Sequence, residues 1–386
     1  MIRASERTVI VGGGFAGLRT AEALRSRGFS GDLLGVSAEA RYTYARPPLS
    51  KEALRNPDGV GAPLPTTADV RWQLGVTATG LDVTGGYVEL DDDRRVAFDA
   101  VVLATGVRAR HLPGPIRGMA LRTAEDAEWL RSVLHGTPGR VVIVGAGFVG
   151  SEVAVAARSR QWHVTVVDVS PSPLATALGP HVARWLWEQH RAHGIELRLG
   201  DPVVAIEKAE ARLHVLLGTG DKLIADAVVT GLGARPNTEW LDGSGLDITD
   251  GVLTDAAQRA VTTGGTALPN VVAVGDLART PTRWADGEAV RWEHWAGATT
   301  DAHRAAAALM GQNLPADVPP VFWTDVYEHR VQVIGLPKGV ESEPEAGPRG
   351  FCVGYRAGGV LTGAVAVNWP QRLPMLRREL CQRAAA

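Results

Sequence analysis

The stretch RVVIVGAGFVGSEVAVAA, residues 140–157, decides how this chain is interpreted. An apolar, strand-like run leads directly into Gly145, Gly147 and Gly150, which have the spacing G-x-G-x-x-G, and a helix-like segment follows. In such a turn the first glycine permits the tight bend, the second lets the backbone approach a pyrophosphate, and the third lets the helix pack on the strand. The stretch therefore predicts a dinucleotide-binding turn, although a single copy of the motif can also serve packing alone.

The same motif occurs a second time, in TVIVGGGFAGLRTAEA at residues 8–23. Each copy continues through a helix, a second strand, a glycine-punctuated meander and a further apolar strand. These last strands read DAVVLATG (99–106) and DAVVTGLG (226–233). The agreement in order and spacing predicts two βαβ domains of one design, each with an inserted three-stranded meander.

The predicted fold class is α/β, with two Rossmann-like dinucleotide-binding domains, their β-meanders and a small α+β C-terminal domain. We expect residues 1–117 and 238–315 to form the first domain and residues 118–237 the second. Pro319-Pro320 then introduces a strand-rich tail, so residues 316–386 form the C-terminal domain.

Composition narrows the function classes. The chain has 386 residues, 45% of them apolar, and a formal net charge of −2, which gives no reason to expect nucleic-acid binding. Its two cysteines, Cys352 and Cys381, are too far apart for a CxxC metal or redox pair, and we expect no metal site. No apolar run approaches the ~20 residues that span a bilayer, and the first strand starts too early for a signal peptide. We expect no membrane partner and a cytoplasmic location; the sequence leaves the oligomeric state open.

A carboxylate that holds an adenine ribose is expected near the end of each second strand. Asp168 lies 18 residues after Gly150, close to the ~20 typical of that carboxylate. The alternative is a strand-end aspartate that only closes a turn. In the first copy Glu39 is the better candidate, although it is displaced relative to Ser37.

Beyond these motifs, the whole chain resembles the oxygenase-coupled ferredoxin reductases of the putidaredoxin reductase type, in the two-dinucleotide-binding-domain flavoprotein superfamily. The motifs that carry the resemblance are RYTYARPPLSKEAL (41–54), ATGVRARHLPGP (104–115), LRTAEDAEWLR (121–131), GAGFVGSEVA (145–154), GLGARPNT (231–238), AVGDLA (273–278), RWEHWAGA (291–298) and FWTDVY (322–327).

The resemblance implies a function for each fingerprint. The first domain is expected to hold FAD, and the second to bind NADH rather than NADPH. The C-terminal domain is then a reductase domain, and the partner a small iron–sulfur ferredoxin that serves a P450 or another oxygenase. A flavin is needed because it converts a two-electron hydride into single-electron steps.

The resemblance also assigns site residues. Those expected at FAD are Gly12, Gly14, Phe15, Ala16, Gly17, Glu39, Arg46, Lys51, Ala104, Thr105, Gly106, Gly275, Asp276, Glu293, His294, Trp295 and Trp323. Those expected at NADH are Gly145, Gly147, Phe148, Val149, Gly150, Glu152, Asp168, Gly231 and Gly233.

Four of these residues have individual roles by resemblance. Arg46 is expected to approach the dinucleotide part of the flavin. Asp276 is expected to accept a hydrogen bond from a flavin ribitol hydroxyl, although it could merely cap a helix. Lys51, just after the candidate N-cap Ser50, is expected beside the reactive edge of the flavin, where a cation stabilises developing negative charge. Glu152 is expected to pair with Lys51. The alternatives are a solvent-facing lysine and a carboxylate placed by the helix dipole.

The chain departs from the family pattern near the flavin. Gly297 and Asp301 stand where Asn and Gln are common, Val326 replaces a Gln, and Thr176 lies near the place of a common Arg. Two other functions therefore stay open: an NADH-dependent flavin oxidase or quinone reductase, and a redox-sensing interaction protein like apoptosis-inducing factor. Cysteine-dependent peroxidase or disulfide chemistry is disfavoured because no cysteine precedes residue 352.

Overall fold

The computed structural model describes residues 6–56 and 61–382. It groups the chain into two compact units. Unit 1 comprises Met1–Ala45, Ala62–Arg108 and Pro236–Val321. Unit 2 comprises Arg46–Gly61, Ala109–Arg235 and Phe322–Ala386. No helix in the described ranges is long and apolar enough to cross a membrane.

Unit 1 is built on a six-stranded sheet. Its strand order is β19 (Arg259–Val261), β20 (Ala267–Ala273), β7 (Ala100–Leu103), β1 (Arg7–Val11), β2 (Asp32–Ser37) and β3 (Arg71–Leu74). All neighbours are parallel except β19 and β20. The buried strands are almost continuously apolar, as expected for a parallel sheet that is covered on both faces.

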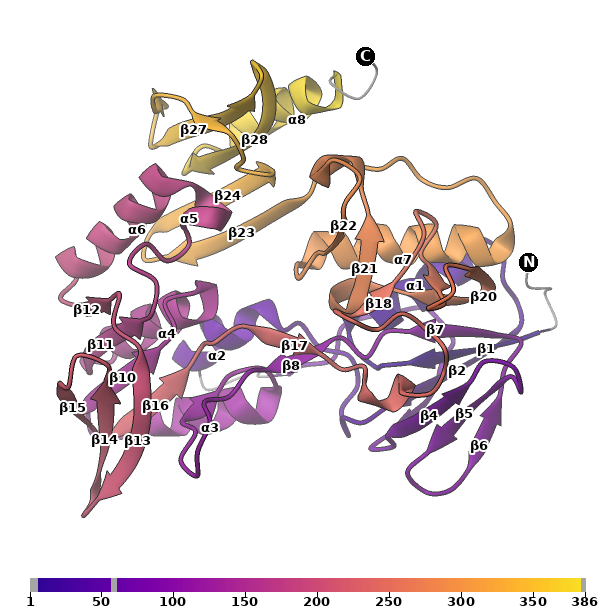
Figure 1. Ribbon diagram of the computed structural model, residues 1–386, viewed down its shortest axis with the longest axis horizontal. Helices are drawn as coiled ribbons and strands as arrows, with labels where there is room; N and C mark the ends of the chain where they lie inside the picture. The colour runs from indigo at the N-terminus through magenta and orange to yellow at the C-terminus, as the bar shows by residue number, and fades with distance from the viewer. Residues whose placement is uncertain (1–5, 57–60, 383–386) are drawn as a thin grey trace. The chain divides into compact units, whose positions relative to one another are not determined.

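Two helices of unit 1, α1 (Phe15–Ser26) and α7 (Trp295–Met310), pack against each other beside this sheet (Figure 1). The helix α7 is rich in alanine, and its Ala305 and Ala306 are fully buried in one apolar cluster with Ile10 and Leu24. Small side chains let the helices approach closely, which brings the N-terminus of α7 near the turn that opens α1.

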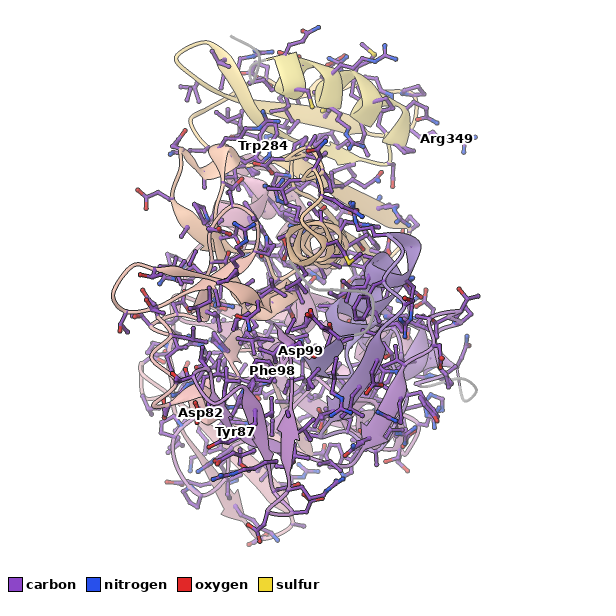
Figure 2. All side chains as sticks on the ribbon, turned by 90° about the vertical axis from the view of Figure 1, so that its right-hand side faces the viewer. Asp82, Tyr87, Phe98, Asp99, Trp284 and Arg349 are labelled. Carbon is purple, nitrogen blue, oxygen red and sulfur yellow. The ribbon has the colours of Figure 1, made fainter. Side chains whose placement is uncertain are left out.

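The meander of unit 1 consists of β4 (Ala78–Asp82), β5 (Tyr87–Leu90) and β6 (Arg95–Ala97), paired antiparallel. Figure 2 shows Asp82 and Tyr87 near each other on this meander, with Phe98 and Asp99 where the chain leaves it for β7. The backbone N–H of Gly85 and the Tyr87 hydroxyl lower the pKa of Asp82. A second small sheet of unit 1 contains β18 (Val252–Leu253), β21 (Ala278–Pro281) and β22 (Ala289–Arg291).

Unit 2 repeats the design. Its parallel sheet has the order β12 (Glu196–Leu199), β11 (His163–Asp168), β10 (Arg140–Val144), β16 (Ala227–Thr230) and β9 (Met119–Ala120). Its longest helices are α3 (Ala124–Leu134), α4 (Phe148–Ser159) and α6 (Pro180–Ala192). The meander is β13 (Val203–Ala209), β14 (Arg212–Leu217) and β15 (Lys222–Ala225).

The aspartates that precede the two AVV strands, Asp99 and Asp226, make equivalent hydrogen bonds. Asp99 Oδ2 accepts from the backbone N–H of Arg7, and Asp226 Oδ2 accepts from that of Arg140, at 2.7 and 2.8 Å. Each aspartate thus fixes the start of the first strand of its own repeat. The predicted pair of βαβ folds, each with a three-stranded meander, is confirmed.

The remaining strands of unit 2 form a mainly antiparallel sheet. Its order is β23 (Val321–Val326), β24 (His329–Gly335), β28 (Val360–Val367), β27 (Phe351–Ala357) and β25 (Val340–Glu341), with β26 (Glu345–Ala346) paired to β27. Helix α8 (Leu373–Gln382) follows β28. This is the α+β architecture expected for the tail, and the α/β fold class is confirmed. The predicted domain boundaries stay predictions.

Candidate nucleotide-binding sites

The first glycine of each fingerprint cannot be replaced without strain. Gly12 has φ +119° and Gly145 has φ +105°, conformations that L side chains rarely adopt. A Cβ on Gly12 would lie 2.1 Å from the Ala104 carbonyl oxygen, and one on Gly145 would lie 2.3 Å from that of Gly231. These glycines therefore let the turn pass close to the next strand of the sheet.

The third glycine of each fingerprint has a packing role. A Cβ on Gly17 would lie 2.2 Å from the Gly12 oxygen, and one on Gly150 would lie 2.0 Å from the Gly145 oxygen. No larger residue lets the helix begin this close to the strand.

The middle glycine of each fingerprint is different, because nothing among the described residues requires it. Gly14 has φ −78°, and, its chain neighbours aside, no heavy atom of residues 6–56 and 61–382 lies within 4 Å of a Cβ built on it. Gly147 has φ −80°, and the nearest atom is the Gly231 oxygen at 3.8 Å. Both face open space at a helix N-terminus, where backbone N–H groups and the helix dipole favour an anion. The two turns thus fit the pyrophosphates of two dinucleotides.

Aromatic side chains adjoin the first turn. The ring of Phe15, the first residue of α1, stacks on that of Trp295 with centroids 3.4 Å apart. His294 caps α7 by accepting from the Gly297 N–H at 2.9 Å. A Cβ on Gly297 would lie 2.9 Å from His294 Cε1, so the departure at residue 297 gives the capping imidazole its space. Burial lowers the pKa of His294. Glu293 forms an ion pair with Arg291 at 2.6 Å.

The first exit strand is held by a side chain that the sequence analysis did not select. The Asn237 amide donates to the Thr105 oxygen at 2.9 Å, the Thr105 hydroxyl donates to the Asn237 oxygen at 2.8 Å, and the Asn237 N–H donates to the Gly106 oxygen. Asn237 thereby fixes residues 104–106, which form one side of the Gly12 turn. Asn237 lies in GLGARPNT (231–238), one of the motifs that carry the family resemblance, so that motif could have indicated it.

Glu39, the displaced ribose candidate, is half-buried beyond β2. Its Oε2 accepts from the Tyr44 hydroxyl at 2.6 Å, and its carbonyl accepts from the Ser37 hydroxyl. Its role toward a ribose stays a prediction.

Asp168 ends β11 beside the second turn. Its Oδ1 accepts from the Ser170 N–H at 2.7 Å, which is the turn-closing bond of the alternative interpretation. Its Oδ2 accepts from the N–H of Ala146, inside the fingerprint, at 2.6 Å. Asp168 therefore connects the strand end to the turn, and ribose binding stays a prediction.

Other NADH candidates surround that turn. The rings of Phe148 and Phe322 meet edge to face at 5.5 Å, and Val149 is exposed. The Gly231 N–H donates to the Val144 oxygen, and Gly233 accepts from the Arg110 N–H.

Lys51 and Glu152 form the predicted pair. Lys51 Nζ lies 2.7 Å from Glu152 Oε1, and their side chains are only 13% and 5% exposed, so Lys51 is not a solvated helix residue. Two hydroxyls that the sequence analysis missed also donate to Glu152: that of Ser50 to Oε2, and that of Thr324 to Oε1 at 2.6 Å. Three donors converge on one buried carboxylate, which makes the cluster rigid.

The expectation that Ser50 caps a helix was wrong. Ser50 ends a 3₁₀ turn, Pro47–Ser50, and Lys51 precedes a short helix, Glu52–Arg55. The Ser50 hydroxyl is bound to Glu152 and caps neither element.

Two further FAD candidates lie in unit 2. Arg46 Nη1 donates to the Arg122 oxygen at 2.8 Å. The Arg330 guanidinium lies over the Trp323 ring at 5.4 Å. Their roles toward a flavin stay predictions.

The other departures differ in surroundings. Val326 is buried on β23, and Asp301 is buried on α7, where it accepts from the Gly275 N–H at 3.1 Å. Asp301 is thus in contact with the predicted flavin turn Gly275–Asp276.

Fold and site together define a protein with two dinucleotide-binding folds and a C-terminal α+β part. The pyridine nucleotide-disulphide oxidoreductase family matches residues 6–302, and the family described as reductase C-terminal matches residues 321–386. Rhodocoxin reductase of Rhodococcus erythropolis is 36% identical over 377 residues, which cover 94% of this chain and 86% of that relative. The ferredoxin–NAD(+) reductase component of the p-cumate 2,3-dioxygenase system of Pseudomonas putida is 34% identical, covering 98% and 94%.

Among solved structures, the covalent putidaredoxin reductase–putidaredoxin complex matches with a TM-score of 0.90 and 29% identity, covering 99% of this chain and 94% of that one. The chain belongs to the pyridine nucleotide-disulphide oxidoreductase family, and the resemblance to putidaredoxin reductase-type flavoproteins is confirmed. Membership implies FAD and NAD(P) as cofactors, which the two glycine turns fit.

Proposed function

We propose that this chain passes electrons from NADH, through FAD, to a small iron–sulfur ferredoxin that serves a P450 or another oxygenase. The observation that carries the proposal is the pair of equivalent glycine turns in a chain whose cysteines both lie outside residues 6–302. With no cysteine pair to reduce inside the nucleotide-binding parts, electrons must leave to a separate acceptor. Relatives named as ferredoxin reductase components of dioxygenase systems support the choice of acceptor.

The residues divide the work. The Gly12 turn holds FAD, and the Gly145 turn holds the exchangeable nucleotide. When bound, FAD supplies the conversion of one hydride into two single electrons. Glu152, with Ser50 and Thr324 as further donors, holds the Lys51 ammonium in one place, so that its charge is preorganised for catalysis.

Stopped-flow spectroscopy tests the proposal. NADH should bleach the flavin absorbance rapidly, and reoxidation by one member of a panel of [2Fe–2S] ferredoxins should be much faster than by dioxygen or a quinone. Fast reoxidation by a quinone or by dioxygen alone would identify the oxidase or quinone reductase. Fast bleaching with no fast acceptor would identify a redox sensor. A cytoplasmic location stays a prediction to be tested separately.

NADH should be preferred to NADPH by roughly 10- to 1000-fold in kcat/KM. A carboxylate at Asp168 accepts from a ribose 2′-hydroxyl but repels a 2′-phosphate, and residues 169–173, VSPSP, offer no arginine to neutralise that phosphate. Partly exposed charges about 4 Å apart interact by a few kcal/mol, which gives this range. Asp168→Ala should narrow the gap, mainly by weakening NADH.

Asp168→Asn is the matched control. Since Asp168 also accepts from Ala146 and Ser170, removing the whole side chain disturbs the turn as well as the charge. The amide keeps the shape, so its effect should appear chiefly as improved use of NADPH. Both donors are compared at fixed ionic strength. Equal or better use of NADPH by the unmutated protein refutes the ribose assignment.

A further inference from the structure

Asp301 is a buried carboxyl that holds a turn of the proposed FAD site. It lies on α7, where Oδ2 accepts from the Gly275 N–H at 3.1 Å and Oδ1 accepts from Gln258 Nε2 at 3.0 Å. Gly275 has φ +69° and precedes Asp276, the predicted ribitol acceptor. Asp301 therefore ties the helix to the turn that is expected to present Asp276 to the flavin.

The hydrogen bonds continue beyond Gln258 through two buried hydroxyls. Gln258 Oε1 accepts from the Thr280 hydroxyl at 3.1 Å, and the Thr280 and Thr254 hydroxyls share a bond of 2.8 Å. Every member of this chain can both donate and accept. If Asp301 gains a proton on Oδ1, the side-chain amide of Gln258 can rotate by half a turn, so that its oxygen accepts the new Asp301 O–H. The Gln258 amide nitrogen then donates to the Thr280 hydroxyl, and the Thr280 hydroxyl donates to that of Thr254. The chain thus satisfies both charge states of Asp301, and Oδ2 accepts from Gly275 in each.

The surroundings make both charge states accessible near neutral pH. Burial raises the pKa of Asp301 to about 7, and the negative charges of Asp276 and Asp317 raise it as well. The hydrogen bond from the Gly275 N–H and the positive charge of Arg304 lower it, but by less. The carboxyl is therefore mostly neutral below pH 7 and ionised above it. The ionisable groups on α7 and on neighbouring segments include Arg19, Glu22, Arg25, Asp255, Arg259, Asp276, Arg283, Arg291, His294, His303, Arg304 and Asp317.

We propose that Asp301 is a positioning residue of the flavin site, and that the charge on its carboxyl controls how tightly FAD is held. The inference rests on the proposed assignment of FAD to the Gly12 turn. FAD brings an anionic pyrophosphate to unit 1, where an ionised Asp301 adds a further negative charge near Asp276. The neutral carboxyl keeps its bond to Gly275 without that charge, so FAD is held more tightly in the protonated state.

The raised pKa of Asp301 also makes the free energy of unfolding depend on pH. The pKa of Asp301 in the folded protein is raised above its usual value of 3.8. The favourable contribution of the neutral group is therefore fully present only below pH 3.8, and it is lost as the pH rises from there through about 7. The Asp301→Asn variant should lack this loss.

Release of FAD from the holoprotein tests the proposal. After dilution, the rise in flavin fluorescence is followed at pH 6.0 and pH 8.5. The unmutated protein should release FAD on the order of tenfold faster at pH 8.5, the size expected for one like charge at moderate distance. Asp301→Asn mimics the neutral carboxyl, since its amide can donate to a rotated Gln258 and accept from Gly275. It should release FAD slowly at both pH values, with less than a twofold difference.

Two further variants separate positioning from charge. Asp301→Ala leaves the Gly275 N–H without its acceptor and should release FAD about tenfold faster at both pH values. Asp201→Asn, at a buried aspartate of unit 2 that accepts from the Thr219 hydroxyl, should keep the full pH dependence of the unmutated protein. Titration of His294 is common to all variants and cancels in the comparison.

Either of two results overturns the proposal: an undiminished pH dependence in Asp301→Asn, or unmutated release rates in Asp301→Ala. Because release is measured without ferredoxin, the proposed electron acceptor can fail independently. A protein that never binds FAD contradicts the proposed function itself. Thermal unfolding of each variant shows whether a change in release reflects global destabilisation.

Discussion

A Gly14→Val variant is expected to fold normally and to lose its FAD. Gly14 has an ordinary extended backbone, and nothing lies within 4 Å of the Cβ that the substitution adds. The added Cβ therefore has open space around it, and the new side chain occupies the space that the pyrophosphate needs at the N-terminus of α1. The purified variant should be colourless, with an unchanged circular dichroism spectrum and less than about a tenth of the normal FAD content.

The second fingerprint provides a matched control. Gly147→Val adds the same side chain at the equivalent open position, with the nearest atom 3.8 Å away. This variant should stay yellow and lose reduction by NADH. Gly12→Val and Gly17→Val are unsuitable, because their side chains would collide with backbone oxygens and damage the fold. A folded Gly14→Val protein with full flavin contradicts the assignment of FAD to the first turn.

Replacing Lys51 with Met should slow flavin reduction by NADH on the order of 10²-fold or more, with FAD still bound. The resemblance places this ammonium beside the reactive flavin edge, where removing one preorganised charge raises the barrier. In the structure this ammonium is already held in place, because Lys51 Nζ lies 2.7 Å from Glu152 Oε1 and the Lys51 side chain is only 13% exposed. Single-turnover bleaching of the flavin absorbance measures the effect without an acceptor.

Two controls separate charge from structural damage. Lys51→Met leaves the buried Glu152 with the Ser50 and Thr324 hydroxyls as its remaining side-chain donors among the described residues. Breaking a buried ion pair from one side commonly costs about 3–5 kcal/mol of stability. The double variant Lys51→Met/Glu152→Gln removes that uncompensated charge and should recover stability but not the rate. Lys51→Arg keeps the charge and should recover part of the rate. An unchanged rate in Lys51→Met returns Lys51 to a structural role.

The sequence predicted the fold and the glycine turns because these depend on local chemistry. A residue with φ above +100° and a carbonyl 2.1 Å from its missing Cβ must be glycine, and this requirement is visible as a spacing. The Lys51–Glu152 pair was predicted only through the family resemblance. Composition alone makes either residue an ordinary charge on a helix.

The hydroxyls on Glu152 and the partners of Asp301 could not be predicted in the same way. Ser50 and Thr324 are 102 and 172 residues from Glu152, and Gln258 is 43 residues from Asp301. Serine, threonine and glutamine are common at surfaces, so nothing in their local pattern shows that tertiary packing buries them against one carboxyl. The prediction that Ser50 caps a helix was wrong for the same reason, because its hydroxyl donates to the carboxylate of Glu152, which is distant in sequence.

The composition of unit 2 limits how this enzyme can be re-engineered. Lys51 reaches Glu152 from Arg46–Gly61 and Thr324 reaches it from Phe322–Ala386, so one cluster draws on all three stretches of the unit. A chimera that imports only residues 109–235 from a relative would set a foreign α4 against the recipient's residues 50, 51 and 324. A transplant of coenzyme specificity must therefore carry three pieces of chain, or be reduced to point substitutions around Asp168.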